Sequence, residues 1–375
     1  MTAISTLGQA LDQISRLNTQ KSTLDTLSTQ LASGKKASQF SGLGDDVLRV
    51  KRARADIKEL DQYNANITNG SRRLQLMQNS IAQMIVQADN VRDALTLGVQ
   101  QGSYTDLSAS KDLATDVQDF MVDLINSRDG ERYLFAGSDS SVKPIEDNSA
   151  FTTFLGNYVP DPDDVTAPPL QTSGFVGEWG SGLISTDEFI SAYRSTNENI
   201  LGYSESLVSG SSGDVRIRVD ENTDFDYTVF GNSEGMKNVI IALGVLEQIP
   251  TVENTPGALN DPTVTAASED VPPSPSEEKQ ENFYAVLNDL ANLLNEGIED
   301  LRQEQKRLAL IEAQISLVKD QNTYQINSFK DIVSEVEDVD LTETATKIQQ
   351  VQVGLEASFS ITALVSDLSL VNFLR

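Results

Sequence analysis

The stretch that decides the fold is Leu60–Met84, "LDQYNANITNGSRRLQLMQNSIAQM", in which apolar residues return every three or four positions. This spacing puts them on one side of a helix, and a repeat of seven residues is typical of a coiled coil. The twelve core positions of the repeat are 60, 63, 67, 70, 74, 77, 81, 84, 88, 91, 95 and 98. Ten of these positions hold apolar residues. The other two are Gly70 and Gly98, each costing about 1 kcal/mol of helix stability relative to Ala.

Further helical repeats lie on both sides of this stretch. Upstream, the apolar stripe is Ile4, Leu7, Leu11, Ile14, Leu17, Leu24, Leu27 and Leu31. Ser33-Gly34 then supplies a stop signal, and Asp45-Asp46 suits the start of the next helix. Downstream, the spacing predicts helices over about 108–126, over 287–336, and from Leu341 to the end of the chain.

Residues 138–282 break the helical pattern. They contain the only Trp and two long acidic stretches. Strict alternation predicts a strand at 215–220 with a partner at 225–231, and the pattern at 233–249 is helical. The Pro-rich, acidic segment 256–278 predicts a flexible connection or insertion. We therefore expect a small α/β region between two helical arms.

The predicted fold class is mainly α. Both chain ends would form a long coiled-coil helical bundle, and a mixed α/β, β-rich domain would be inserted centrally. Neither terminal helix can bury its stripe alone, so the simplest solution brings the two ends together. We expect three domains: a terminal coiled-coil assembly domain (1–42 with 337–375), a helical trunk with a short hairpin (43–137 with 283–336), and an acidic insert (138–282).

Composition and charge exclude several classes of function. The 375 residues carry a net charge of −28, with neither Cys nor His. The charge argues against nucleic acid and against an anionic membrane surface as partners. Without Cys and His, the sequence lacks the usual ligands of zinc, copper and haem, and it offers no thiolate or imidazole for catalysis. About two thirds of the excess negative charge lies in 137–282, where 25 acidic residues face 6 basic ones.

The start of the chain predicts no cleaved secretory signal. "MTAISTLGQALDQISRLN" has no basic segment followed by an apolar core. No run of 18 apolar residues occurs, which predicts no membrane span. We expect a soluble protein that, if exported, leaves by a route that reads no classical signal.

Acidic motifs offer only weak candidates for a metal or catalytic site. Asp220, Asn222 and Asp224 begin like a calcium loop, but Phe225 and Gly231 stand where Gly and Glu are required. The "DPDD" at 161–164 reads as a solvated turn, and Asp338 with Asp340 reads as a helix cap rather than a catalytic pair. Ser and Thr lack a base placed by motif, and no phosphate-binding loop occurs. The prediction is no enzyme, no cofactor and no metal.

The stretch 128–138, "RDGERYLFAGS", could line a ligand pocket or be structural. Asp129-Gly130 is a turn signal, and Tyr133 and Phe135 fall on one face of a short extended segment. A pocket needs convergent polar groups, and the sequence names none. We therefore expect a small trunk hairpin built on Tyr133, Phe135 and Gly137.

Several segments together resemble the flagellin superfamily of bacterial flagella. They are "LASGKKASQFSGLGDD", "LDQYNANITNGSRRLQLMQNSIAQM" and "DVDLTETATKIQQVQVGLEASFSITALVSDLSLVNFLR", in that order and near the two ends of the chain. One position departs from the pattern, because Val47 follows the Asp-Asp pair where Pro is common. Within the superfamily, "INSRDGERYLFAGSDS" resembles the hook-associated junction proteins more than the flagellins.

The resemblance implies a non-enzymatic, extracellular subunit of the bacterial flagellum, exported through the type III apparatus. It implies self-association in a helical or ring assembly, contact with a neighbouring hook-associated protein and with flagellin, and an export chaperone on the C-terminal helix. The residues expected at the assembly interface are Ile4, Leu7, Leu11, Ile14, Leu355, Phe359, Leu364 and Leu368. We also expect the terminal helices to be loosely ordered before assembly.

Three alternatives stay open from the sequence. The nearest is flagellin itself, or a flagellin-like filament protein. The second is another type III-secreted coiled-coil protein, such as a translocator or adhesin, although the chain lacks the apolar segment that a translocator needs. The third is an enzyme within residues 138–282.

Overall fold

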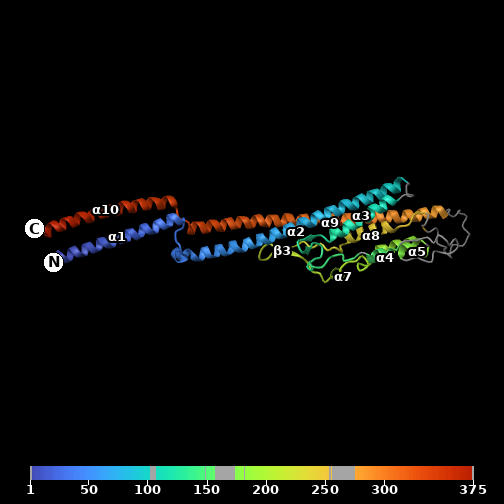
Figure 1. Cartoon of the computed structure of the whole chain (residues 1–375), viewed down its shortest axis with the longest axis horizontal. Helices are drawn as coiled ribbons and strands as arrows, with labels where there is room; N and C mark the ends of the chain where they lie inside the picture. The colour runs from blue at the N-terminus through green and yellow to red at the C-terminus, as the bar shows by residue number, and fades with distance from the viewer. Residues whose placement is uncertain are drawn as a thin grey trace. The chain divides into compact units, whose positions relative to one another are not determined.

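The computed structural model describes residues 2–101, 107–147, 149–156, 174–180, 182–252, 255 and 275–373. Long helices dominate it and small antiparallel hairpins lie between them, so the predicted mainly α class is confirmed (Figure 1). The elements, in chain order, are α1 (Thr2–Ser33), η1 (Phe40–Asp46), α2 (Val47–Gln101), α3 (Ser108–Ile125), β1 (Arg128–Asp129), β2 (Arg132–Tyr133), α4 (Ser149–Leu155), α5 (Phe175–Gly180), α6 (Thr186–Arg194), α7 (Glu205–Val208), β3 (Arg216–Arg218), β4 (Asp224–Asp226), α8 (Glu234–Gln248), α9 (Pro275–Glu337) and α10 (Leu341–Phe373). The predicted flexible segment 256–278 lies outside the described residues as far as 274. Its last four residues, 275–278, form the first turn of α9, so the prediction is wrong there.

The chain forms two compact units. One consists of Met1–Gln62 and Asp320–Arg375, and the other of Tyr63–Lys319. Helices α2 and α9 contribute to both. The three-domain division expected from the sequence stays a prediction, and limited proteolysis would test it.

In the unit 63–319, α2 and α9 run antiparallel and bury their predicted stripes. Arg302 of α9 pairs with Asp89 of α2 at 2.9 Å, and Gln75 of α2 donates to Glu312 of α9 at 2.9 Å. The buried residues of α2 include Ile67, Leu74, Met77, Ile81, Met84, Ala88, Val91 and Leu95. Those of α9 include Leu287, Leu290, Leu294, Leu301, Leu308, Ile311 and Ile315. Each follows the spacing that its sequence pattern predicts.

Helix α8 is the apolar centre of this unit. Almost all of its residues from Gly235 to Leu246 are buried, and α3, α4 and α6 pack against it. Helices α8 and α9 meet at two glycines, because a Cβ on Gly297 would lie 2.9 Å from the Gly235 carbonyl oxygen. Aromatic rings extend this core, with Trp179 stacked on Phe189 at 4.8 Å.

The predicted pair of strands is confirmed as the β3–β4 hairpin. Its register pairs Ile217 with Phe225. The strands, at 216–218 and 224–226, are shorter than the predicted 215–220 and 225–231. Ile217 lies against α2 at Gly70, where an added Cβ would come within 2.3 Å of the Ile217 side chain. The heptad position that lacks a side chain is therefore the place where the hairpin approaches the helix.

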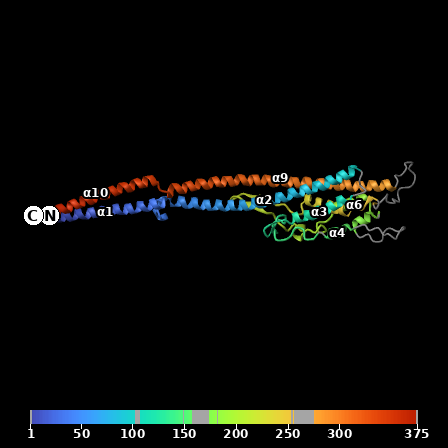
Figure 2. The same ribbon diagram turned by 45° about the horizontal axis from the view of Figure 1, so that its top comes forward.

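The unit formed by 1–62 and 320–375 contains the terminal helices. In both views, α1 and α10 lie side by side (Figures 1 and 2), and their backbones are in contact. Helix α1 ends as the sequence predicts, because Gly34 takes the left-handed conformation with φ of 69° and its N–H donates to the Gln30 carbonyl. Beyond it, η1 leads into α2 directly after Asp45-Asp46.

Candidate assembly site

The α1–α10 pair meets along one face of each helix. The Ser358 hydroxyl donates to Gln20 Oε1 at 3.3 Å, and an added Cβ on Gly354 would lie 3.3 Å from Gln20 Nε2. These contacts identify the facing sides of the two helices. The half-buried residues of α1 that share this side are Gln13, Leu17, Gln20, Leu24, Leu27 and Gln30.

This seam between α1 and α10 is incompletely covered. Among the described side chains of the two helices, no apolar one is fully buried, and the leucines alternate with glutamines. The helix α1 also carries a run of hydroxyls that bond back to the preceding turn, such as Thr19 to the Ser15 carbonyl and Thr23 to the Thr19 carbonyl. Such bonds slightly destabilise a helix and often bend it. The pair therefore has a weak interior of its own.

Large apolar side chains on both helices point into solvent. Leu11 and Ile14 of α1 are 59% and 54% exposed, and Val353, Phe359 and Ile361 of α10 are 66%, 61% and 53% exposed. Exposed apolar groups of this size along a helix pair are typical of a surface that a protein partner covers. Leu11 and Ile14 also line a shallow groove along α1 whose other walls are polar.

The structure separates the residues predicted for the interface into groups. Leu11, Ile14 and Phe359 lie on the exposed surface, whereas Leu355 is half-buried. The side chains of Ile4, Leu7, Leu364 and Leu368 lie outside the described residues. The single stripe expected on α1 is divided, because Leu17, Leu24 and Leu27 are half-buried on the seam face while Leu11 and Ile14 are exposed.

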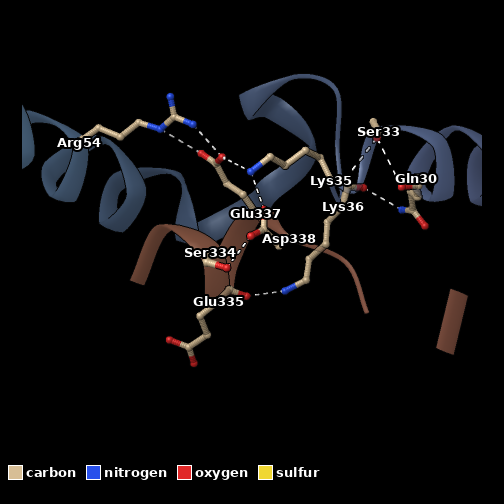
Figure 3. A network of polar contacts seen from close by, with 9 residues as sticks. All are labelled: Gln30, Ser33, Lys35, Lys36, Arg54, Ser334, Glu335, Glu337 and Asp338. Atoms are coloured by element: carbon tan, nitrogen blue, oxygen red, sulfur yellow. Dashed lines mark hydrogen bonds and ion pairs between the residues drawn. The ribbon is translucent and has the colours of Figure 1, made fainter. Parts of the chain in front are cut away.

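A short backbone bridge joins the end of α1 to the start of α10. Lys36 N–H donates to the Glu337 carbonyl at 2.7 Å, and Val339 N–H donates to the Gly34 carbonyl at 3.0 Å. We call this pairing of 34–36 with 337–339 the linker bridge. Figure 3 shows the side chains around it. It fixes the exit of one terminal helix beside the entry of the other.

Ion pairs surround the linker bridge. Lys35 Nζ lies 2.5 Å from Asp338 Oδ1 and 3.5 Å from Glu337 Oε2. Arg54 of α2 holds the Glu337 carboxylate with two nitrogens, at 3.1 and 2.7 Å (Figure 3). The Glu337 side chain is only 8% exposed, so this forked pair compensates a nearly buried charge.

The electrostatics of the linker bridge follow from these contacts. The hydrogen bond to Asp338 raises the pKa of Lys35 above its ordinary value. The same bond, with a second from the Ser334 hydroxyl, lowers the pKa of Asp338. Both side chains are more than 40% exposed, so the stabilisation is limited by solvent screening.

The expected cap at the start of α10 is half right. Asp340 Oδ1 accepts from the Thr342 and Glu343 N–H groups at 2.8 and 3.0 Å, which is an N-cap. Asp338 does not cap this helix, because its carboxylate is taken by Lys35 and Ser334. The long-range ion pair outcompetes the local role that the sequence indicated.

The trunk hairpin forms as expected. Arg128 pairs with Tyr133 and Asp129 with Arg132, around Gly130 at φ of 64°. Tyr133 and Phe135 are buried, and Gly137 has φ of 65° with a side chain of Phe230 where its Cβ would be. Arg73 of α2 donates to the Tyr133 carbonyl at 2.6 Å, which fastens the hairpin to the long helix.

The acidic motifs act as turns. Asp220 Oδ1 accepts from the Asn222 and Thr223 N–H groups, which closes the β3–β4 loop and lowers the pKa of Asp220. Across the described residues, no group of three or more acidic side chains is arranged to hold a metal ion. The "DPDD" at 161–164 lies outside those residues.

Sequence reasoning missed the linker bridge. Its partners are about 300 positions apart, so no local spacing reveals them. The available signal was the basic "GKK" after one terminal helix and the acidic "EVEDVD" before the other, which are charge-complementary if the two ends meet.

Comparison with known proteins identifies the first third of the chain. Residues 4–140 match the model of the bacterial flagellin N-terminal helical region. The N-terminal part of this chain is similar to that of the flagellins. The resemblance to the flagellin superfamily is thereby confirmed for this part of the chain. The matched flagellin region takes in α1, α2, α3 and the trunk hairpin.

Two further comparisons add little to the flagellin match. No curated protein matches the chain. A solved structure described as a flagellar hook-associated protein from Vibrio parahaemolyticus is 12% identical, with a TM-score of 0.41, and the alignment covers 77% of this chain and 97% of that one. Of the helices in the described part of the chain, none is both long and apolar enough to cross a membrane.

Proposed function

We propose that this chain is the flagellar subunit that joins the hook to the flagellin filament, and that it assembles through α1 and α10. The observation that carries the assembly role is the exposure of Leu11, Ile14 and Phe359 on a helix pair with an incomplete interior. Covering one such side chain contributes about 1.5–3 kcal/mol, so copies gain by packing these helices together. Unlike patches meeting head to tail generate rings or helical assemblies.

The trunk hairpin supports a junction subunit over a filament subunit. It closely follows α3, and Arg73 of α2 donates to its Tyr133 carbonyl. Filament flagellins usually carry a longer helical, Gln/Asn/Gly-rich segment at this place. The proposal includes hook-associated and flagellin neighbours, and export through the type III apparatus. A chaperone on α10 would cover Val353, Phe359 and Ile361 before assembly.

A pair of variants tests the assembly role. Ile14→Asp with Phe359→Asp places two charges on the exposed apolar surface, whereas Ser28→Asp with Gln352→Asp places them on exposed polar positions of the same helices. We expect the first variant to keep wild-type circular dichroism and to lose self-association in sedimentation velocity. The second should associate like the wild type. Equal association of both variants would refute the assembly surface.

Electron microscopy of the purified protein separates the junction from the filament. A junction subunit should give rings or short discrete assemblies, and gold-labelled antibodies should mark flagella only at the end of the hook. Long filaments grown from the protein alone, with label along the shaft, would support the flagellin alternative instead.

A further inference from the structure

A cavity of about 640 Å³ in the unit 63–319 is lined by an unusual concentration of arginine. Five arginines and one carboxylate, Asp129, line it, in a chain with twice as many acidic as basic residues. The arginines are Arg72, Arg73, Arg132, Arg216 and Arg218. They come from α2, from the trunk hairpin and from β3, so three separate segments converge on one space.

The floor of the cavity holds a buried guanidinium, Arg73, that forms no ion pair with a carboxylate of the described residues. Arg73 is 5% exposed, its Nη2 donates to the Tyr133 carbonyl, and its Nε has no hydrogen-bond partner. Tyr227, also buried, lines the same floor. A buried charge left without compensation is costly, because the low-dielectric interior does not replace its hydration. An anion in the cavity would supply that compensation.

A second cation near Arg73, Arg132, forms no ion pair with a carboxylate of the described residues. Arg132 is exposed, and its Nε donates to the Ser140 hydroxyl at 3.0 Å. Burial lowers the pKa of Arg73 and the nearby charge of Arg132 lowers it further, whereas Tyr227 and Asp129 raise it. The two guanidiniums therefore repel each other, and Asp129 offsets only part of that repulsion. An anion between them would turn this repulsion into two attractions.

The remaining arginines form the rim. Arg72 pairs with Asp129 at 3.0 Å, Arg216 with Asp214 at 3.0 Å, and Arg218 with Asp224 at 3.3 Å. The pairs of Arg216 and Arg218 are exposed on both sides and contribute little to stability, whereas the Asp129 side chain is only 19% exposed. Each guanidinium has five N–H donors in a planar fork, so one carboxylate contact leaves donors for a ligand.

From this arrangement we infer that the cavity between α2, the trunk hairpin and β3 binds a small, doubly charged oxyanion, with Arg73 and Arg132 at its centre. Phosphate, sulfate and short dicarboxylates share the required chemistry, because their oxygens match the guanidinium fork. The site contains no residue of α1 or α10, so a test of anion binding does not depend on whether the assembly role is correct.

Isothermal titration calorimetry of the full-length protein tests this inference. Inorganic phosphate and succinate are titrated separately at constant ionic strength, with chloride as the reference ion. We expect saturable one-site binding of at least one of the two, which would also assign the tetrahedral or the dicarboxylate class. No saturable heat from either ion would overturn the proposal.

Two matched variants locate the site. Arg132→Gln removes an exposed central cation, and Arg302→Gln removes a cation of the same unit that does not line the cavity. Loss of one charge-assisted contact should weaken binding about tenfold in Arg132→Gln and leave it unchanged in Arg302→Gln. Circular dichroism confirms that both variants fold. Equal affinities in all three proteins would overturn the assignment to this cavity.

Discussion

At the scale of single residues, Gly70 and Glu337 make structural contacts that their local sequence pattern does not predict. Gly70 interrupts the heptad of α2 and costs helix stability, yet it is where Ile217 packs. Glu337 follows a heptad-bearing helix as one of several acidic residues, yet it is almost buried beneath Arg54 and Lys35. In both cases the partner lies far away in sequence.

The role of Gly70 can be tested against a matched glycine of the same helix. In Gly70→Ala the new Cβ collides with the buried Ile217, and this overpacking should destabilise the unit 63–319 by about 1–3 kcal/mol. The higher helix propensity of Ala offsets part of this cost. Gly98→Ala meets nothing within 4 Å and should stabilise by up to about 1 kcal/mol. Thermal unfolding of both variants measures the difference, and stabilisation by Gly70→Ala would contradict it.

The linker bridge should respond to acid. The pKa of Asp338 is lowered in the folded state, so its contribution is present above the ordinary value of 3.8 and is lost as the pH falls through the lower folded value. For this exposed pair we expect about 0.2–1 kcal/mol. The measurement is hydrogen exchange at the Lys36 and Val339 amides across that range, corrected for intrinsic exchange.

Asp338→Asn serves as the control for the acid response. It should speed exchange of the Lys36 and Val339 amides at neutral pH and flatten their pH dependence. The idea fails if wild type and variant lose protection in parallel as the pH is lowered.

At the scale of elements, the two long pairs of helices differ in how they are stabilised. Helices α2 and α9 bury leucine, isoleucine and methionine completely in the unit 63–319. The seam of α1 and α10 places Gln20 opposite Gly354 and Ser358, and buries no described apolar side chain fully. A polar residue in such a seam lowers stability and helps to specify the pairing.

The polar seam predicts that the terminal helices gain order from one substitution. Gln20→Leu should stabilise the α1–α10 pair of the dilute protein by about 1 kcal/mol, through added apolar burial. Ser28→Leu adds the same side chain at an exposed position of α1 and should leave the pair unchanged. Hydrogen exchange over residues 11–33 reads the result, and equal protection in the two variants would count against the assigned seam.

Periodicity was sufficient to predict most helices and the β3–β4 hairpin from the sequence. It placed the buried face of α2 from Ile67 to Leu95 and of α9 from Leu287 to Ile315. It could not divide the α1 stripe into seam and exposed surface, because that depends on which side α10 takes. It also did not predict the arginine cavity, because the arginines come from three segments that are far apart in the sequence and follow no common repeat.

At the scale of the whole molecule, charge opposes the association that apolar surface favours. A net charge of −28 makes copies repel each other at low ionic strength. The screening length falls from roughly 30 Å at 0.01 M salt to roughly 8 Å at 0.15 M. We therefore expect self-association to increase over this range, as measured by light scattering at fixed protein concentration. Weaker association at the higher salt would indicate that ion pairs hold the copies together.

The sequence by itself determined the helical class, the meeting of the two chain ends, the trunk hairpin and the flagellin-type resemblance. It could do so because helical periodicity, turn signals and net charge are properties of neighbouring residues. Only the tertiary structure decided that Asp338 pairs with Lys35, that Leu17 and Ile14 serve different faces, and that Arg73 and Arg132 line one cavity. Those results depend on contacts between distant segments, whose energies exist only after the chain has folded.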